Sequence, residues 1–180
     1  IPEQAQTVYV GKRSGHHSVP QPQINQILLE QAQQGKRVVR LKGGDPFLFG
    51  RGGEELELLR EHNIPFEVVP GITSAIAVPA YNGIPVTHRD YCSSVHIITA
   101  HSKQDGELNI PFPALCQLHG TLVFLMGVTS MERICRGLLQ AGMDAQTPAA
   151  ILQEGTSAAQ RRVVATLSTL VERAQQEKIQ

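Results

Sequence analysis

A short β-prone run that ends in paired glycines constrains this fold more than any other feature. Residues 37–41 read Arg-Val-Val-Arg-Leu, and Gly43 and Gly44 follow almost at once. β-branched residues favour a strand, and glycines let the backbone approach a ligand without side chains in the way. Residues 38–53 are therefore predicted to form a buried strand that ends in a ligand-binding turn. An ordinary tight turn is the alternative, but three more glycines by residue 53 favour a site.

Along the rest of the chain, β-prone runs alternate with segments whose apolar residues follow helical spacing. Strands are predicted at residues 7–10, 37–41, 66–69, 95–99, 121–126, 149–152 and 162–167. Helices are predicted from starts near Pro20, Leu56, Thr73, Met131 and Ser168. This order indicates an α/β fold whose first lobe has a mostly parallel sheet. The last two strands are close enough to be joined without a helix, which gives the second lobe a mixed sheet.

The stretch from Gly83 to Tyr91 is the best candidate for a linker between two α/β lobes. The predicted N-terminal lobe therefore covers residues 1–86 and the C-terminal lobe residues 87–180. In open parallel sheets, ligands bind outside the carboxyl ends of the strands, and pockets favour positions between lobes.

Composition excludes several classes of protein. The chain has 180 residues, 41% of them apolar and 18% charged, which is typical of a globular protein. Its 16 basic and 16 acidic residues argue against nucleic-acid binding through a broad basic surface. No apolar run is long enough to span a membrane. Cys92, Cys116 and Cys135 fit neither a disulfide framework nor a zinc spacing, and indicate free thiols in a cytoplasmic protein.

The polar loop after the first predicted strand carries two candidate functional residues. Lys12 can relay a proton if a pocket lowers its pKa, although most lysines are simply solvated. Arg13 suits a substrate carboxylate, which arginine binds in a bidentate manner. The neighbouring His16 and His17 lack the helical spacing of a metal site, so no metal is expected.

Polar residues at other strand ends add to this set. Asp45 offers a carboxylate for ribose hydroxyls or a cationic amine. Thr73 and Ser74 begin a helix, where hydroxyls and exposed amides suit the polar end of a ligand or serve only as a cap. His88 and Arg89 place a basic pair in the linker. Neither the dinucleotide fingerprint nor a P-loop pattern occurs, so hydride and phosphoryl transfer lose their main support.

Together these segments resemble the tetrapyrrole methylase family, and most closely the members that methylate uroporphyrinogen III. The similar segments are residues 10–17 (VGKRSGHH), 40–55 (RLKGGDPFLFGRGGEE), 69–75 (VPGITSA) and 83–89 (GIPVTHR). Weaker similarity extends over residues 124–127 (FLMG), 154–156 (EGT) and Gln160. The resemblance covers essentially the whole chain.

The resemblance implies two α/β lobes, a homodimer, and S-adenosylmethionine bound in a cleft between the lobes. It implies a cytoplasmic enzyme that methylates uroporphyrinogen III twice, giving precorrin-2 for sirohaem or cobalamin synthesis, with no nucleic-acid or membrane partner. The positions similar to cofactor contacts are Gly43, Gly44, Asp45, Leu48, Thr73, Ser74, Met126 and Gly155. Lys12 is similar to the lysine with a proton-transfer role. The candidates for binding substrate carboxylates are Arg13, Arg51, His88 and Arg89.

The chain also departs from the family pattern. The family begins with a strand, a glycine-rich cofactor loop and an aspartate, and ends with a further strand; this sequence contains none of these. We therefore expect a sequence truncated at both ends that binds cofactor poorly alone. Another methyltransferase of the family, and a non-catalytic ligand-binding or dimerisation module, remain the alternatives.

Overall fold

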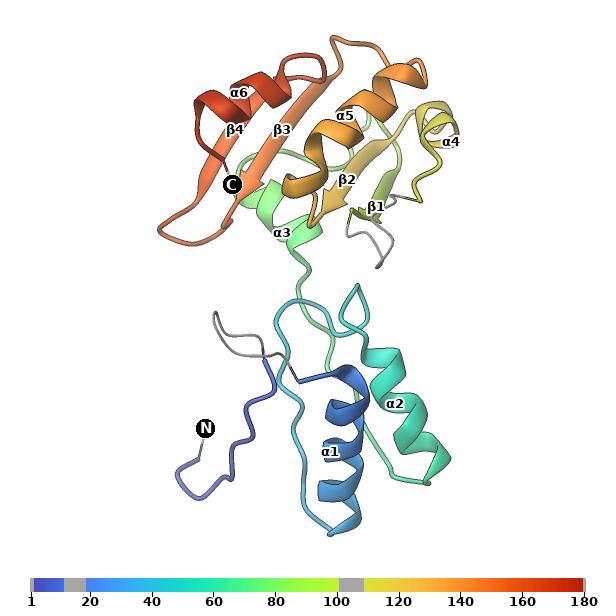
Figure 1. Cartoon of the computed structure of the whole chain (residues 1–180), viewed down its shortest axis with the longest axis vertical. Helices are drawn as coiled ribbons and strands as arrows, with labels where there is room; N and C mark the ends of the chain where they lie inside the picture. Colours follow the sequence, from blue (N-terminus) through green and yellow to red (C-terminus); the bar gives the residue numbers. More distant parts are fainter. Residues whose placement is uncertain (1, 12–18, 101–108, 180) are drawn as a thin grey trace. The chain divides into compact units, whose positions relative to one another are not determined.

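The computed structural model describes residues 2–11, 19–100 and 109–179 (Figure 1). The chain divides into two compact units, Ile1–Gly71 and Ile72–Gln180. This division comes earlier in the sequence than the boundary we predicted after residue 86. The helix that follows Gly71 packs within the second unit, where Val78 lies against Gly155.

Two helices pack against each other in the first unit. Helix α1 (Gln21–Gln33) begins directly after Pro20, and helix α2 (Gly52–Glu61) packs against it. Pro20 suits a helix start because its fixed φ is helical and a first-turn N–H needs no partner. Gly35 ends α1 with a φ of 75°, as its position predicted. The buried side chains of α1 are Ile24, Leu28 and Leu29.

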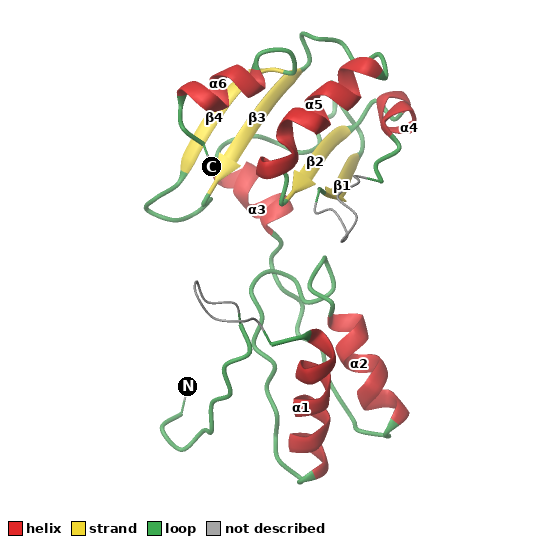
Figure 2. Cartoon of the chain, viewed as in Figure 1, coloured by secondary structure: helices red, strands yellow, loops and turns green. Residues whose placement is uncertain are grey.

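The three strands predicted for the first unit are wrong within the described residues. Residues 7–10, 37–41 and 66–69 run as extended loops with no backbone ladder (Figure 2). These segments are not buried either: Val39 and Leu41 in residues 37–41 are each 76% exposed, and Val69 in residues 66–69 is 81% exposed. β propensity describes how a residue fits a paired, half-buried sheet, so an apolar run without a partner strand does not become one.

The second unit contains the sheets. Its elements are α3 (Ser74–Tyr81), β1 (Val95–Thr99), α4 (Phe112–Gln117), β2 (Thr121–Leu125), a 3-10 turn at Val128–Ser130, α5 (Met131–Gln140), β3 (Pro148–Gln153), β4 (Arg161–Thr166) and α6 (Leu170–Gln176). β1 and β2 pair in parallel, and β3 and β4 pair antiparallel. The four strands predicted here are confirmed, and so is the direct β3–β4 connection. The parallel and antiparallel pairings expected of a mixed sheet are both present, in two separate two-stranded sheets. Helix α4 was missed.

The core of the second unit lies between its strands and the helices α5 and α6. Helix α6 packs on β3 and β4 and contacts α5 (Figure 2). The buried core residues are Ala100, Ile134, Cys135, Leu138, Ile151, Val163, Leu167, Leu170 and Ala174. All three cysteines are free thiols, with Cys135 buried and the other two half-buried. Nowhere in the described ranges is a helix long and apolar enough to cross a bilayer.

Candidate functional site

The loop after Gly43 is organised by the Asp45 carboxylate. Oδ1 accepts hydrogen bonds from the backbone N–H groups of Phe47 (2.9 Å) and Leu48 (3.1 Å). Oδ2 accepts from the N–H of Gly71 at 3.1 Å. The bond from Gly71, followed by those from Phe47 and Leu48, holds the pKa of Asp45 below its ordinary value of 3.8. Asp45 therefore joins two loops of the first unit, a role that the sequence did not predict.

Glycine is required where these two loops meet. A Cβ on Gly71 would lie 2.1 Å from the carbonyl oxygen of Gly44, and Gly44 itself has a φ of 70°. A Cβ on Gly43, in contrast, would meet no atom within 4 Å, and Gly43 is exposed. Its backbone is therefore open to an approaching molecule, whereas the backbones of Gly44 and Gly71 are in contact.

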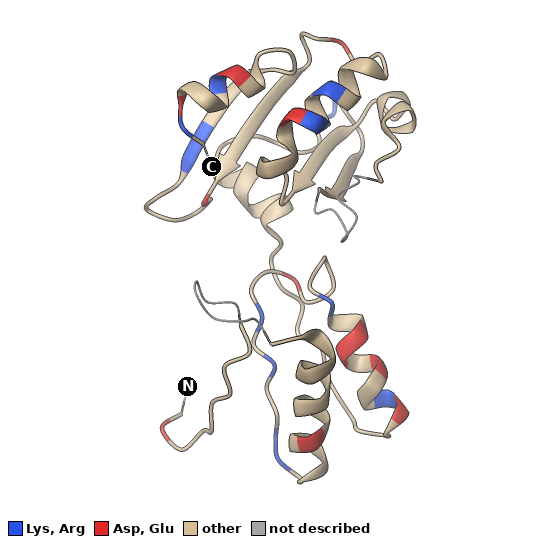
Figure 3. Ribbon diagram, viewed as in Figure 1, with Lys and Arg blue, Asp and Glu red and all other residues tan. Residues whose placement is uncertain are grey.

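A buried carboxylate from α2 anchors the segment that leads into this loop. Glu55 is 4% exposed and accepts hydrogen bonds from Lys42 Nζ (2.9 Å), Arg40 Nε (3.0 Å) and Gln21 Nε2 (3.1 Å). Burial raises the pKa of Glu55, but the hydrogen bonds from Lys42, Gln21 and Arg40 outweigh it and leave the pKa lowered. Figure 3 shows the basic residues of the loop that leads to Gly43 and the acidic residues of α2, both in the first unit. Glu55 was not among the predicted site residues, although it is the last residue of the 40–55 segment that resembles the family.

Arg51, a predicted substrate-binding residue, is already paired in this structure. Its Nε and one terminal nitrogen donate to the two carboxylate oxygens of Glu54, at 2.8 and 2.6 Å. The hydrogen bond from Arg51 lowers the pKa of Glu54. Both side chains are about half exposed, at 54% and 50%. A substrate carboxylate would therefore have to replace Glu54 as the partner of Arg51.

The second unit contains the other predicted cofactor positions, at the start of α3 and after β2 and β3. Thr73 is the N-cap of α3, and its Oγ1 accepts the N–H of Ala75 at 3.2 Å, while Ser74 is exposed. Met126 follows β2 with a φ of 57° and is 55% exposed. Gly155 follows β3, and a Cβ on it would lie 2.3 Å from Val78 Cγ1 of α3. The carboxyl ends of β2 and β3 face the same side of the unit, next to α3 (Figure 1).

The two predicted residues in the linker lie in a tight turn. His88 and Cys92 exchange backbone hydrogen bonds at 2.8 and 2.9 Å. The N–H of Asp90 donates to His88 Nδ1 at 3.2 Å, and the Tyr91 ring lies 4.8 Å from the His88 ring. His88 and Arg89 are both exposed. Lys12 and Arg13 lie outside the described residues.

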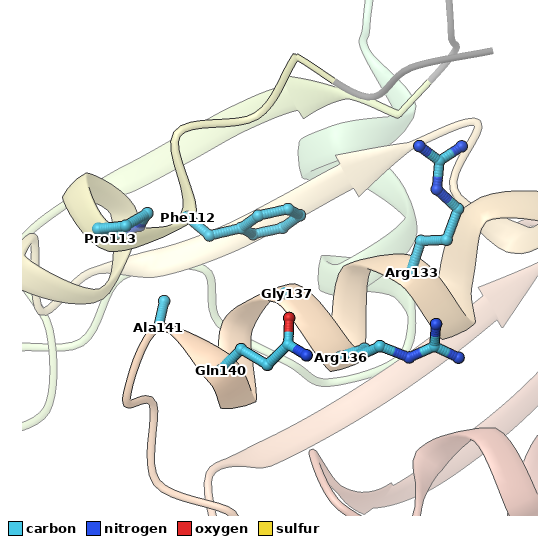
Figure 4. Close-up of a pocket in the computed structure, with 7 residues that line it drawn as sticks. All are labelled: Phe112, Pro113, Arg133, Arg136, Gly137, Gln140 and Ala141. Carbon is cyan, nitrogen blue, oxygen red and sulfur yellow. The ribbon is translucent and has the colours of Figure 1, made fainter.

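A shallow hollow of about 420 Å³ lies elsewhere on the second unit, between α4 and α5 (Figure 4). It is lined by Phe112, Pro113, Arg133, Arg136, Gly137, Gln140 and Ala141. None of these is a predicted site residue, and Arg136 pairs with Glu132. In the described ranges, no three His, Cys, Asp or Glu side chains gather so as to hold a metal ion.

Among the predicted cofactor positions, Gly43, Ser74 and Met126 are exposed, whereas Thr73 and Gly155 are half-buried. The exposed groups suit the binding of a polar small molecule in a fixed orientation.

Comparisons with curated proteins identify relatives of the whole chain. It is 58% identical over 174 residues to the porphyrin biosynthesis protein HemD of Ruminiclostridium josui, which covers 97% of this chain and 34% of that protein. It is also 58% identical over 166 residues to siroheme synthase 2 of Serratia proteamaculans (strain 568), covering 92% of this chain and 35% of that protein. The chain thus spans about a third of the length of these curated relatives.

Solved structures show the same relationship. The uroporphyrin-III C-methyl transferase from Thermus thermophilus, complexed with S-adenyl homocysteine, matches with a TM-score of 0.74 and 36% identity. That match covers 94% of this chain and 71% of the other. The cobalt precorrin-4 methyltransferase CbiF matches with a TM-score of 0.78 at 24% identity, over 92% of this chain and 68% of the other, which shows a shared fold.

The family model described as tetrapyrrole (corrin/porphyrin) methylases matches residues 1–171. This match includes the loop at Gly43, the start of α3, and the loops that carry Met126 and Gly155. The chain belongs to the tetrapyrrole methylase family.

Proposed function

We propose that this chain catalyses S-adenosylmethionine-dependent C-methylation of uroporphyrinogen III, with two methyl transfers that give precorrin-2. The observation that carries the proposal is the 36% identity, over 94% of the chain, to a uroporphyrin-III C-methyl transferase complexed with S-adenyl homocysteine. The relatives named for porphyrin and siroheme synthesis support the same pathway.

The cofactor contacts that we propose are mainly backbone contacts. Gly43, Gly44 and Leu48 would contribute from the first unit, and Asp45 would hold that loop in shape. Thr73, Ser74, Met126 and Gly155 would contribute from the second unit. The residues fit such a ligand because the Gly43 backbone is open and Met126 is exposed. When bound, S-adenosylmethionine supplies an electrophilic methyl group and leaves as S-adenosylhomocysteine.

The remaining chemistry would fall to side chains of the chain. Each transfer forms a carbon–carbon bond on a pyrrole ring and releases one proton, and we assign the movement of that proton to Lys12. Uroporphyrinogen III carries carboxylates on every ring, which suits binding by Arg13, Arg51, His88 and Arg89. Arg51 would exchange Glu54 for a substrate carboxylate.

The decisive experiment uses the complete polypeptide that the gene encodes. We expect it to convert uroporphyrinogen III and S-adenosylmethionine to a product with the absorbance of precorrin-2, releasing two S-adenosylhomocysteine molecules per tetrapyrrole. A panel of later precorrins separates this activity from that of other family members. Turnover of a later precorrin but not of uroporphyrinogen III would overturn the proposal.

The role of Lys12 is tested separately from cofactor binding. Lys12→Ala should abolish most methyl transfer while leaving the affinity for S-adenosylhomocysteine unchanged by calorimetry. Lys36→Ala is the control, because Lys36 is an exposed lysine that bonds only Gln6 and Gln31 side chains in the described structure. Full turnover by the Lys12 variant would remove it from catalysis.

We further propose that the protein is a cytoplasmic homodimer. Light scattering of the purified complete polypeptide measures its mass in solution, and a monomer at working concentrations would contradict this assembly.

A further inference from the structure

The loop that carries Gly155 has an unusual backbone. Glu154 and Thr156, on either side of Gly155, have φ values of 49° and 66°. Left-handed backbone is uncommon outside glycine, and for a β-branched residue such as Thr156 it is a genuine outlier. Such conformations persist only where the surrounding structure enforces them, and they cluster at sites that hold ligands.

Side chains of the same loop enforce part of this geometry. Ser157 Oγ donates a hydrogen bond to the Glu154 carbonyl at 2.7 Å. The N–H of Thr156 donates to Gln160 Oε1 at 2.8 Å. Gln160 thus fixes the peptide that follows Gly155.

The other end of the Gln160 side chain is bonded to α3. Its Nε2 donates to Asn82 Oδ1 at 3.2 Å, and Asn82 Nδ2 donates back to Gln160 Oε1 at 3.3 Å. Asn82 is the C-cap of α3, and its Nδ2 also donates to the Val78 carbonyl at 2.9 Å. Both amides are half-buried, so this reciprocal pair forms a fixed connection rather than a solvated surface contact.

Gly155 itself is pressed against the same helix. The 2.3 Å distance from a Cβ on Gly155 to Val78 Cγ1 shows that the loop backbone and α3 are in direct contact. Helix α3 starts at Ser74 and has only eight residues. The amide pair at its far end therefore sets the position of the Gly155 backbone relative to Thr73 and Ser74.

From this geometry we infer that Asn82 and Gln160 are positioning residues for cofactor binding. They hold the left-handed loop at Gly155 against α3, so that the loop backbone and the hydroxyls at the start of α3 meet one ligand in a fixed arrangement. This inference rests on the proposed function, since it takes Gly155, Thr73 and Ser74 as cofactor contacts.

The test measures cofactor affinity and kinetics in the complete polypeptide. Gln160→Ala and Asn82→Ala should each weaken S-adenosylhomocysteine binding about tenfold by calorimetry, and raise the KM for S-adenosylmethionine with little change in kcat. The double variant should lose less than the sum of the two single losses, because both substitutions break the same pair. Gln140→Ala, an exposed amide on α5, should bind as the unchanged protein does.

A conservative variant separates positioning from simple stability. Gln160→Glu keeps an acceptor for the Thr156 N–H but cannot donate to Asn82, so its affinity should lie between those of Gln160→Ala and the unchanged protein. It also serves if Gln160→Ala does not fold. Unchanged affinity in folded Gln160 and Asn82 variants would overturn the inference. Failure of the unchanged polypeptide to bind S-adenosylhomocysteine would instead reject the proposed function and, with it, the assigned role of the pair.

Discussion

The two units of this chain contain similar apolar segments and use them differently. In the second unit, apolar runs pair as β1 with β2 and β3 with β4, and Ile151 and Val163 are buried in the resulting core. In the first unit, residues 37–41 and 66–69 have the same β-prone composition but no ladder among the described residues, and Val39 and Val69 are exposed.

The difference shows which interactions hold each unit together. The second unit is stabilised mainly by apolar burial around Leu138. The first unit depends more on charged and polar anchors: Glu55 holds the segment before Gly43, and Asp45 joins that loop to Gly71. We therefore expect the two units to respond differently to the same kinds of substitution.

The largest contrast is expected from one leucine in each unit. Leu138 is 4% exposed, so Leu138→Ala should cost about 3 kcal/mol of unfolding free energy through lost burial and a cavity. Leu41 is 76% exposed, so Leu41→Ala should change stability by less than about 0.5 kcal/mol. Denaturant unfolding measures both. A large cost at Leu41 would show that residues 37–41 are packed against something and would remove the contrast.

Alanine at two glycines should separate backbone clashes from side-chain clashes. Gly71→Ala in the first unit meets the Gly44 carbonyl, and Gly155→Ala in the second meets Val78. Each should cost about 2 kcal/mol. Adding Val78→Ala should recover much of the stability of the Gly155 variant, since it removes the clashing methyl groups. The clash of Gly71→Ala is with a backbone oxygen, so no side-chain substitution can relieve it. If Gly71→Ala left the stability unchanged, the close contact with Gly44 would be contradicted.

Removing the buried carboxylate should affect only the first unit. Glu55→Gln leaves Lys42 and Arg40 without their ion partner, and because these are 12% and 29% exposed we expect a loss of about 2 kcal/mol. Glu54→Gln, at the exposed pair with Arg51, should cost less than about 1 kcal/mol. Hydrogen exchange resolved by segment locates the effect. Equal losses for the two variants would mean that burial of Glu55 is unimportant.

The smallest expected effect is a selective sensitivity to acid. The described carboxyl groups with lowered pKa values are Asp45, Glu54 and Glu55, all in the first unit. Their stabilisation is complete above the ordinary pKa values of 3.8 and 4.5, and it is lost as the pH falls through the lower values of the folded state. Protection from hydrogen exchange, measured relative to the intrinsic rate at each pH, should therefore be lost in the first unit before the second on acidification. The reverse order would contradict this assignment.

The same comparison explains what the sequence could predict. The four strands predicted for the second unit are confirmed because each apolar run pairs with another one, and α5 was predicted because Ile134 and Leu138 follow helical spacing. The strand at 37–41 was predicted from β propensity, which carries no information about a partner. Helix α4 was missed because Pro111 and Pro113 enclose its start and it has only six residues.

Around the predicted site, the sequence predicted local geometry better than contacts between distant segments. The turn at Gly43 and the cap at Thr73 were predicted from local patterns, and the structure shows an open backbone at the first and a capping hydroxyl at the second. The bond between Asp45 and Gly71, and the burial of Glu55, depend on packing between segments far apart in the sequence. Short motifs do not contain that information.

The Asp45–Gly71 hydrogen bond also has a consequence for folding. It closes a loop of chain around α2, and the entropic cost of closing a loop rises only slowly with its length. The Gly71 amide proton becomes protected only once that loop is closed. Pulse-labelling hydrogen exchange at the Gly71 amide during refolding would therefore report, at a single backbone position, when α2 and the glycine turn have assembled.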